Sequence, residues 1–233
     1  MRTETAPDPR WVAELAGRSL EASRSAIEEA AAETALFRHL ARRHQEGGRP
    51  GYVEIDAPLE LFALARLTRP HEVVEVGVSS GVSTAYLLAA LDRNRRGRLH
   101  SIDLPKRPRP NRPRTTRPTE SWAIPEGRDS GWAVPKRLRS RWDLRIGDKK
   151  DLLPALAGEL DHVDLFLYDV PHEDGASARE FRAVDAAFRP GSVAIVDHGP
   201  SGDLCPALDH WANRRRASPV RCQDLGLYGF RAR

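Results

Sequence analysis

From residue 73 onward, short apolar runs alternate with segments of helical periodicity, and this alternation limits the fold more than any other feature of the sequence. A short apolar run bounded by turn residues predicts a buried strand, and strands that alternate with helices predict a parallel, doubly wound α/β sheet. We expect strands over residues 73–76, 99–102, 144–146, 163–168 and 193–196. We expect the intervening helices over residues 84–91, 152–156, 176–188 and 204–214.

Both ends of the chain add elements to this sheet. Residues 11–45 are rich in Ala, Glu and Arg with interspersed leucines, which predicts one or two amphipathic helices, and residues 58–67 predict another. Residues 219–222 and 225–230 predict a closing pair of strands at or near a sheet edge. The expected fold is therefore Rossmann-like: a doubly wound, mostly parallel sheet with a C-terminal antiparallel strand pair and extra N-terminal helices. We divide the 233 residues into an N-terminal helical extension, 1–51, and one main domain, 52–233.

A long stretch without clear periodicity, residues 105–141, interrupts the alternation of strands and helices between the second and third strands. Its first part, Lys106 to Arg117, carries six basic residues and no acid, so with a net charge of +4 the rest of the chain is slightly acidic. Like charges interleaved with prolines repel one another and cannot form a core, so this part should stay solvated. Trp122 and Trp132 favour order in the second part. We interpret residues 105–141 as a lid-like insertion.

Composition restricts the class of protein. With 40% hydrophobic and 30% charged residues, the chain is too apolar for wholesale disorder and too polar for packing in a membrane. The longest uncharged run, Val76 to Leu91, is too short to span a bilayer, and the N-terminus lacks the apolar segment of a secretion signal. We therefore expect a cytoplasmic protein without membrane contact, in which Cys205 and Cys222 stay reduced.

Carboxylates follow the predicted strands at one end. Each of five acids lies where a strand ends or shortly after it: Glu75, Asp103, Asp148, Asp169 and Asp197. Parallel sheets bind ligands beyond the carboxyl ends of their strands, so these side chains should converge. Crowded carboxylates repel one another and need cations or donors to stay ionised, which implies a cationic cofactor or a metal ion.

The turn after the first strand distinguishes between kinds of nucleotide-binding site. Its sequence is Glu75-Val-Gly77-Val-Ser79-Ser80-Gly81. A dinucleotide fingerprint requires a second glycine at position 79, and a Walker loop requires Gly-Lys-Ser/Thr; this turn has neither. Asp103 lies 26 positions beyond Gly77, where it is placed to bond ribose hydroxyls. A nucleoside without phosphate fits both observations, and the crowded carboxylates favour one that carries a positive charge.

In these motifs the chain resembles the class I S-adenosylmethionine (SAM)-dependent methyltransferases, and within them the metal-dependent O-methyltransferases of the catechol and caffeoyl-CoA type. The resemblance covers about Tyr52 to the C-terminus. It implies that SAM binds at the turn, with Asp103 on the ribose and Asp148 near the adenine amino group. The cofactor-binding residues that it implies are Glu75, Gly77, Ser79, Ser80, Gly81, Asp103, Asp148 and Asp169.

The same resemblance implies the reaction site. Asp169, Asp197 and His198 correspond to the ligands of a divalent metal, Mg or Mn. His172, three residues after Asp169, corresponds to a general base, so the implied catalytic residues are His172 and Asp169. His198 replaces the usual Asn or Asp, and a nitrogen ligand shifts the preference from magnesium toward manganese, iron, cobalt or zinc. We interpret His100, His162 and His210 as packed or solvated.

The resemblance thus implies an O-methyltransferase that acts on the hydroxyl of a small-molecule acceptor, anionic if the basic loop attracts it, and a homodimer is compatible with the sequence. A nicotinamide-dependent reductase would need the second glycine and a Tyr-x-x-x-Lys pair, which the sequence lacks. Two alternatives stay open. An RNA methyltransferase would hold phosphates with residues 106–117, although confinement of the charge to one loop argues against nucleic acid. A non-enzymatic protein with this fold would bind the cofactor but would not transfer its methyl group.

Overall fold

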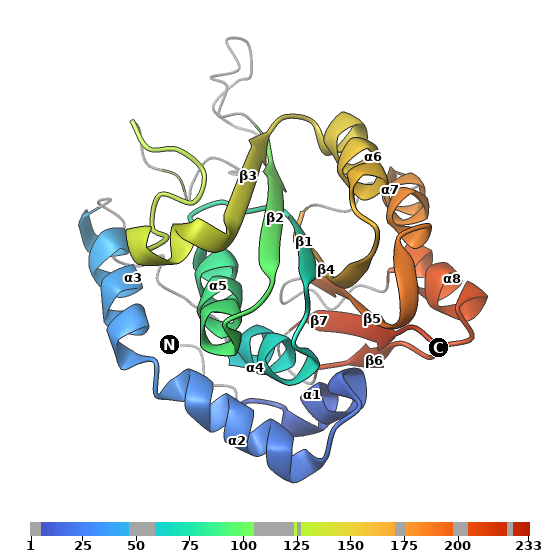
Figure 1. The fold of residues 1–233 in the computed structure, drawn as a ribbon, viewed down its shortest axis with the longest axis horizontal. Helices are drawn as coiled ribbons and strands as arrows, with labels where there is room; N and C mark the ends of the chain where they lie inside the picture. Colours follow the sequence, from blue (N-terminus) through green and yellow to red (C-terminus); the bar gives the residue numbers. More distant parts are fainter. Residues whose placement is uncertain are drawn as a thin grey trace, which may run out of the picture.

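A seven-stranded sheet with the order β3-β2-β1-β4-β5-β7-β6 forms the centre of the computed structural model (Figure 1). The structure describes residues 6–46, 59–104, 124, 127–170, 176–197, 205–222 and 226–233. The strands are β1 (Glu72–Val76), β2 (Arg98–Asp103), β3 (Trp142–Ile146), β4 (Val163–Tyr168), β5 (Phe188–Asp197), β6 (Val220–Arg221) and β7 (Leu227–Arg231). Strands β1 to β5 pair in parallel, and β7 lies antiparallel between β5 and β6. The predicted Rossmann-like sheet with a C-terminal antiparallel pair is confirmed.

Helices cover both faces of the sheet (Figure 1). They are α1 (Pro9–Ala16), α2 (Leu20–Ala31), α3 (Thr34–Glu46), α4 (Leu59–Thr68), α5 (Val82–Asn94), the 3-10 helix η2 (Lys136–Arg141), α6 (Lys149–Glu159), α7 (Ala176–Asp185) and α8 (Pro206–Arg214). Val73 and Val74 are neighbours on β1 but belong to different hydrophobic clusters, because successive strand residues point to opposite faces. Helices α1 to α5 contribute to one cluster and α6 to α8 to the other. Burial on both faces explains the continuous apolar runs of β4 and β5, residues 165–168 and 193–196.

Local signals explain where the N-terminal helices divide. The sequence predicts one or two helices over residues 11–45, and the structure has three. Gly17 ends α1 in the left-handed conformation, with a φ of +61°, which costs a glycine little. The Ser19 hydroxyl then accepts the Ala22 N–H at 3.2 Å and caps the start of α2.

The helix predicted over residues 176–188 is too long at its C-terminal end. Helix α7 ends at Asp185, and Phe188 already belongs to β5. The reason is tertiary: Phe188 pairs with Val163 of β4, and its ring centroid lies 4.6 Å from that of Trp211 on α8. A single apolar residue at the end of an amphipathic pattern does not show whether it packs from a helix or from a strand.

The N-terminal helices share the core of the main domain. Trp11 is 2% exposed, and its indole N–H donates to the Val220 carbonyl of β6 at 3.1 Å. The Arg231 guanidinium of β7 donates to the carbonyls of Leu15 and Ala16 at the end of α1. Helix α1 is therefore packed against the β6–β7 edge of the sheet, whereas α2 packs on α1 and α4. None of the helices in the described ranges is long and apolar enough to cross a membrane.

Candidate functional site

The β1–α5 turn crosses directly beside the end of β4. The Gly77 N–H donates to the Ile102 carbonyl of β2 at 2.9 Å, and the Asp169 N–H donates to the Val76 carbonyl at 2.8 Å. Gly77 has a φ of +96°, and a Cβ built there would overlap the Asp169 carbonyl oxygen. Only glycine fits, because any other residue would clash and would adopt an unfavourable backbone conformation. The first glycine of the predicted motif thus allows two strand ends to approach closely.

Asp103 ends β2 and directs its carboxylate toward the turn. One carboxylate oxygen accepts the Ser79 N–H at 3.1 Å, and the other accepts the Leu104 N–H at 3.0 Å. Ser79 adopts a φ of +51°, which is uncommon for a residue other than glycine. Each carboxylate oxygen has a second lone pair for a further donor. Asp103 is therefore oriented beside the turn with acceptor capacity left for hydroxyl groups.

Glu75 lies behind the turn, inside the protein. It is 0% exposed and accepts three hydroxyl hydrogen bonds, from Ser83 at 2.7 Å, Thr84 at 2.8 Å and Ser101 at 2.7 Å. Burial raises the pKa of Glu75 to about 7, and the three hydroxyls offset this only in part. The resemblance implies cofactor binding for Glu75; the structure places its carboxylate where it joins β1 to β2 and to the first turn of α5.

The end of β3 adds an acid and an apolar surface. Asp148 is exposed and caps α6, where its carboxylate accepts a backbone N–H at 2.9 Å. The Gly147 N–H donates to the Asp103 carbonyl at 2.9 Å, which joins this loop to the end of β2. Leu104 and Ile146 are 50% and 49% exposed, and Ile146 is the register partner of Asp103. Sequence reasoning missed this exposed apolar pair, although Leu104 directly follows one predicted acid.

Asp169 directly follows β4, and Asp197 is the last residue of the neighbouring strand β5. Part of the Asp169 residue is exposed to solvent, but the protein atoms around its carboxyl group exclude water from it, and this desolvation raises its pKa well above the usual range. Repulsion by the carboxylates of Asp197, Glu75 and Asp103 raises the pKa further. The structure thus brings these four acids to one edge of the sheet. Two predicted site residues, His172 and His198, lie outside the described residues. Among the residues that the structure describes, no group of three or more acids, histidines or cysteines is placed to hold a metal ion.

The described part of the predicted insertion contacts the turn. The Gly131 N–H donates to the Ser79 carbonyl at 2.8 Å, and the Ala133 N–H donates to the Ser80 carbonyl at 3.0 Å. Trp132 lies between them in sequence and is 7% exposed. Residues 131–133 pack on the turn and, through Trp132 and Ala133, on α3. The basic segment 106–117 and Trp122 lie outside the described residues.

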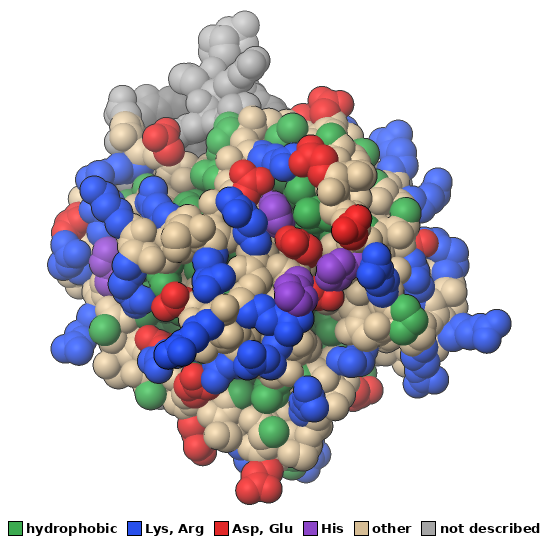
Figure 2. All heavy atoms as spheres, in the orientation of Figure 1, with side chains coloured by type: hydrophobic (Ala, Val, Ile, Leu, Met, Phe, Trp, Pro, Cys, Tyr) green, Lys and Arg blue, Asp and Glu red, His purple; other side chains and the backbone are tan. Residues whose placement is uncertain are grey.

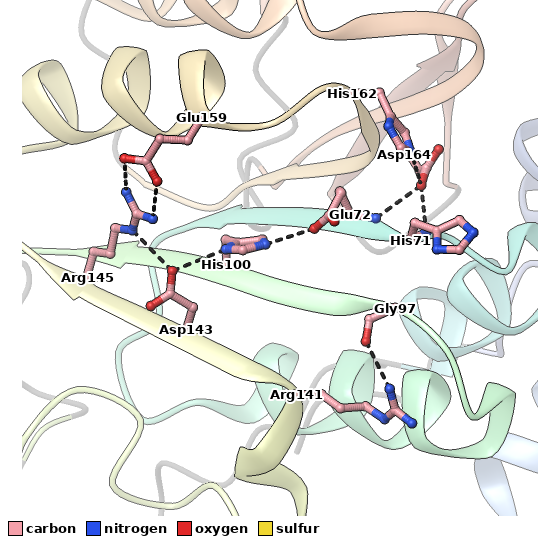
Figure 3. Close-up of polar contacts among 10 residues, drawn as sticks. All are labelled: His71, Glu72, Gly97, His100, Arg141, Asp143, Arg145, Glu159, His162 and Asp164. Carbon is pink, nitrogen blue, oxygen red and sulfur yellow. Dashed lines mark hydrogen bonds and ion pairs between the residues drawn. The ribbon is translucent and has the colours of Figure 1, made fainter.

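His100 and His162 contact acids other than the four at the strand ends (Figure 3). His100 of β2 lies 2.9 Å from a carboxylate oxygen of Glu72 and 3.2 Å from one of Asp143. His162 lies 3.4 Å from the Asp164 carboxylate. Figure 2 shows histidine side chains beside acidic ones on the viewed face, close to a group of Lys and Arg side chains. These contacts agree with the interpretation of His100 and His162 as packed residues.

Comparison with known proteins gives the family. A family model described as a methyltransferase domain matches residues 74–198, which is more than half of the chain. A search of curated protein sequences found no significant match.

Solved structures of methyltransferases share the fold at low sequence identity. The O-methyltransferase from Bacillus cereus, solved with S-adenosylhomocysteine (SAH), is 15% identical and has a TM-score of 0.54 over 85% of this chain and 90% of that chain. The O-methyltransferase TomG from Streptomyces achromogenes, involved in tomaymycin synthesis and solved with SAM, is 19% identical, with a TM-score of 0.54 over 84% and 88%. The SAH-bound methyltransferase PaMTH1 from Podospora anserina is 13% identical, with a TM-score of 0.56 over 85% and 88%. The match over residues 74–198, on a sheet of this topology, shows that the chain belongs to the methyltransferase-domain family, as its resemblance to the class I enzymes predicts.

Proposed function

We propose that the chain transfers the methyl group of SAM to a hydroxyl oxygen of a small-molecule acceptor. The observation that carries the proposal is the convergence of Asp103, Asp169 and Asp197 at one edge of the sheet, beside the turn that Asp103 holds. Carboxylates that repel one another favour a cationic ligand, and the sulfonium of SAM is one. The O-methyltransferases from B. cereus and S. achromogenes, which share the fold, support oxygen as the acceptor atom.

The residues at the carboxyl ends of the strands offer contacts for the ribose, the adenine and the methionine moiety of SAM. Asp103 has lone pairs available for the ribose hydroxyls. The half-exposed side chains of Leu104 and Ile146 offer an apolar surface to the adenine ring, and Asp148 follows Ile146 by two residues at the start of α6. Residues 77–81 would hold the methionine moiety. When bound, SAM supplies the electrophilic methyl group, so the protein must hold the acceptor oxygen in line and remove its proton.

His172 is the base in this proposal. It follows the end of β4 in sequence, three residues after Asp169. An imidazole with a pKa of about 6.5 is mostly neutral at pH 7, so it can accept the proton of the acceptor hydroxyl. Asp169 would orient this imidazole or bind the metal described next.

Asp169 and Asp197, with His198 as a third ligand, are proposed to hold Mg or Mn. The carboxylates of Asp169 and Asp197 repel each other across adjacent strand ends, and a cation between them would offset that repulsion. Carboxylates suit both ions, and the histidine nitrogen favours manganese. A divalent ion held there would lower the pKa of the acceptor hydroxyl.

Calorimetric titration with SAH tests the cofactor site. Asp103→Ala removes a charged hydrogen-bond acceptor, which should weaken SAH binding by roughly ten- to a hundredfold. Asp161→Ala is the matched control, because Asp161 precedes β4 at the opposite edge of the sheet and should bind SAH like the wild type. Equal affinity in Asp103→Ala and wild type would contradict the assignment of Asp103. A wild-type protein that does not bind SAH would contradict the proposed function.

A further inference from the structure

Residues 131–134, which we call the brace, bond to the backbone of the β1–α5 turn at other groups than Asp103 does. The Ser79 N–H is bonded by Asp103, whereas the Ser79 and Ser80 carbonyls are bonded by backbone N–H groups of the brace at 2.8 and 3.0 Å. Both peptide groups of Ser79 are therefore engaged, and this residue has the uncommon φ of +51°. The brace stabilises a turn conformation that a serine does not adopt readily by itself.

Close packing couples the brace to the turn and to β3. A Cβ built on Gly81 would lie 2.5 Å from Val134 Cγ2 and 2.9 Å from the Gly131 Cα. A Cβ built on Gly131 would overlap the ring of Trp142. The Trp142 indole N–H donates to the Ser101 hydroxyl at 2.9 Å. Because Gly81 packs against Val134 and Gly131 without free space, a shift in the position of the brace would also shift the turn.

Helix α3 holds the brace from its other side. The Arg43 guanidinium donates to the Trp132 carbonyl at 3.1 Å and lies 5.3 Å from the centroid of the Trp132 ring. The His39 Nε2–H donates to the Ala133 carbonyl at 3.1 Å. The His44 ring lies 5.3 Å from the Trp132 ring. Three side chains of one helix thus fix both the backbone and the side chain of the brace.

We propose that Arg43 and Trp132 are positioning residues of the cofactor site, through which α3 keeps Ser79 and Ser80 in the conformation that binds SAM. Neither residue needs to touch the ligand: Arg43 orders the brace, and the brace orders the turn. A turn that is already ordered loses less conformational freedom when it binds, so the affinity for SAM and SAH is higher. This inference rests on the proposed function, and it adds a residue of the N-terminal helices to the cofactor site.

Arg43→Ala and Arg42→Ala form a matched pair of variants. Both arginines lie on α3 and pair with Glu46, at 2.8 and 2.6 Å, but only Arg43 contacts the brace in the described structure. We expect Arg43→Ala to bind SAH about tenfold more weakly than wild type, because the free energy needed to order the turn would then be spent on binding. Arg42→Ala should stay within about twofold of wild type, as expected for an exposed ion pair. Arg43→Lys keeps a cation that can donate to the Trp132 carbonyl, so it should recover part of the affinity.

Amide hydrogen exchange separates positioning from a general loss of stability. Arg43→Ala should speed the exchange of the Ser79 and Gly81 N–H groups, at a temperature where circular dichroism shows each variant folded. Arg42→Ala should not speed it. If Arg43→Ala lowers the melting temperature but keeps the SAH affinity and the exchange rates of Arg42→Ala, the inference is wrong and the proposed function stands. If the wild type itself does not bind SAH, both are wrong.

Discussion

Glu75 shows how one side chain organises the end of β1. Its carboxylate bonds Ser83 and Thr84 on α5 and Ser101 on β2, and the Ser101 hydroxyl also accepts the Trp142 indole N–H from β3. Four elements therefore meet at one buried acid. The hydrogen-bond partners described for Glu75 are neutral hydroxyls, so the ionised carboxylate is costly to bury, and burial raises its pKa to about 7.

We expect the stability of Glu75→Gln relative to wild type to depend on pH. The folded-state pKa of about 7 exceeds the ordinary value of 4.5, so the folded protein binds this proton more tightly than the unfolded chain does. The resulting stabilisation is complete below about pH 4.5 and is lost as the pH rises through 7. Glutamine does not ionise, so between pH 5 and pH 8 the variant should gain roughly 2 to 3 kcal/mol of unfolding free energy relative to wild type.

Urea unfolding at the two pH values measures this difference. Glu14→Gln, which changes an exposed acid on α1, is the control and should differ from wild type by the same amount at both pH values. A pH-independent difference for Glu75→Gln would mean that the hydroxyls keep the buried carboxylate ionised at little cost.

At the scale of elements, the site combines acids at the strand ends with an insertion between β2 and β3. Residues 131 and 133 of this insertion bond to the backbone of the β1–α5 turn. Asp169 directly follows β4 and Asp197 ends its parallel neighbour β5, which is why residues far apart in sequence interact there. The insertion joins a basic segment, residues 106–117, to the brace that packs on the turn. Its two parts should therefore have different functions, one toward the acceptor and one toward the cofactor.

Deletion of residues 107–116 tests the first of these functions. SAH affinity should stay within about twofold of wild type, whereas turnover of an acceptor that carries phosphate or carboxylate should fall at low salt, because a basic loop increases the association rate of anions. Wild-type turnover should decrease as sodium chloride is added, and turnover of the deletion variant should not. Full activity of the deletion variant at low salt would exclude a role of this segment in acceptor capture.

Asp197→Asn tests the metal site at the ends of β4 and β5. Replacing one of two charged ligands should weaken Mn²⁺ binding at least about tenfold, as measured by electron paramagnetic resonance titration in the presence of SAH. Asp161→Asn at the opposite edge is the control and should leave Mn²⁺ binding unchanged. If the wild type binds no Mn²⁺, transfer would depend on His172 without a metal ion.

At the scale of the whole molecule, the N-terminal helices and one face of the sheet share a hydrophobic cluster. The buried residues of α1, α2 and α3 belong to the same hydrophobic cluster as Val73 of β1 and Leu99 of β2. Trp11 also reaches β6 through its indole N–H. Residues near the two ends of the chain therefore pack together, and the stability of the sheet edge depends on α1.

Trp11→Ala should destabilise the whole protein by about 3 to 5 kcal/mol, the usual cost of truncating a buried tryptophan. Phe37→Ala is the matched control on α3, because Phe37 is 48% exposed and its truncation should cost less than about 1 kcal/mol. Thermal unfolding followed by circular dichroism gives both values. A separate early transition in Trp11→Ala, with the main transition unchanged, would show that the helices fold independently of the sheet.

Local sequence pattern was sufficient for the α/β alternation, for the acids at the strand ends and for the glycine at position 77, because strand and helix periods and turn chemistry act over a few residues. It did not show that Glu75 turns inward, since a strand residue beside a ligand turn can point to either face until its neighbours are known. Nor did it show that Arg43 of α3 holds the brace against Ser79, or that Leu104 and Ile146 stay exposed beside Asp103. Those arrangements join segments far apart in the chain, and such contacts depend on how the helices and strands pack, which local periodicity does not determine.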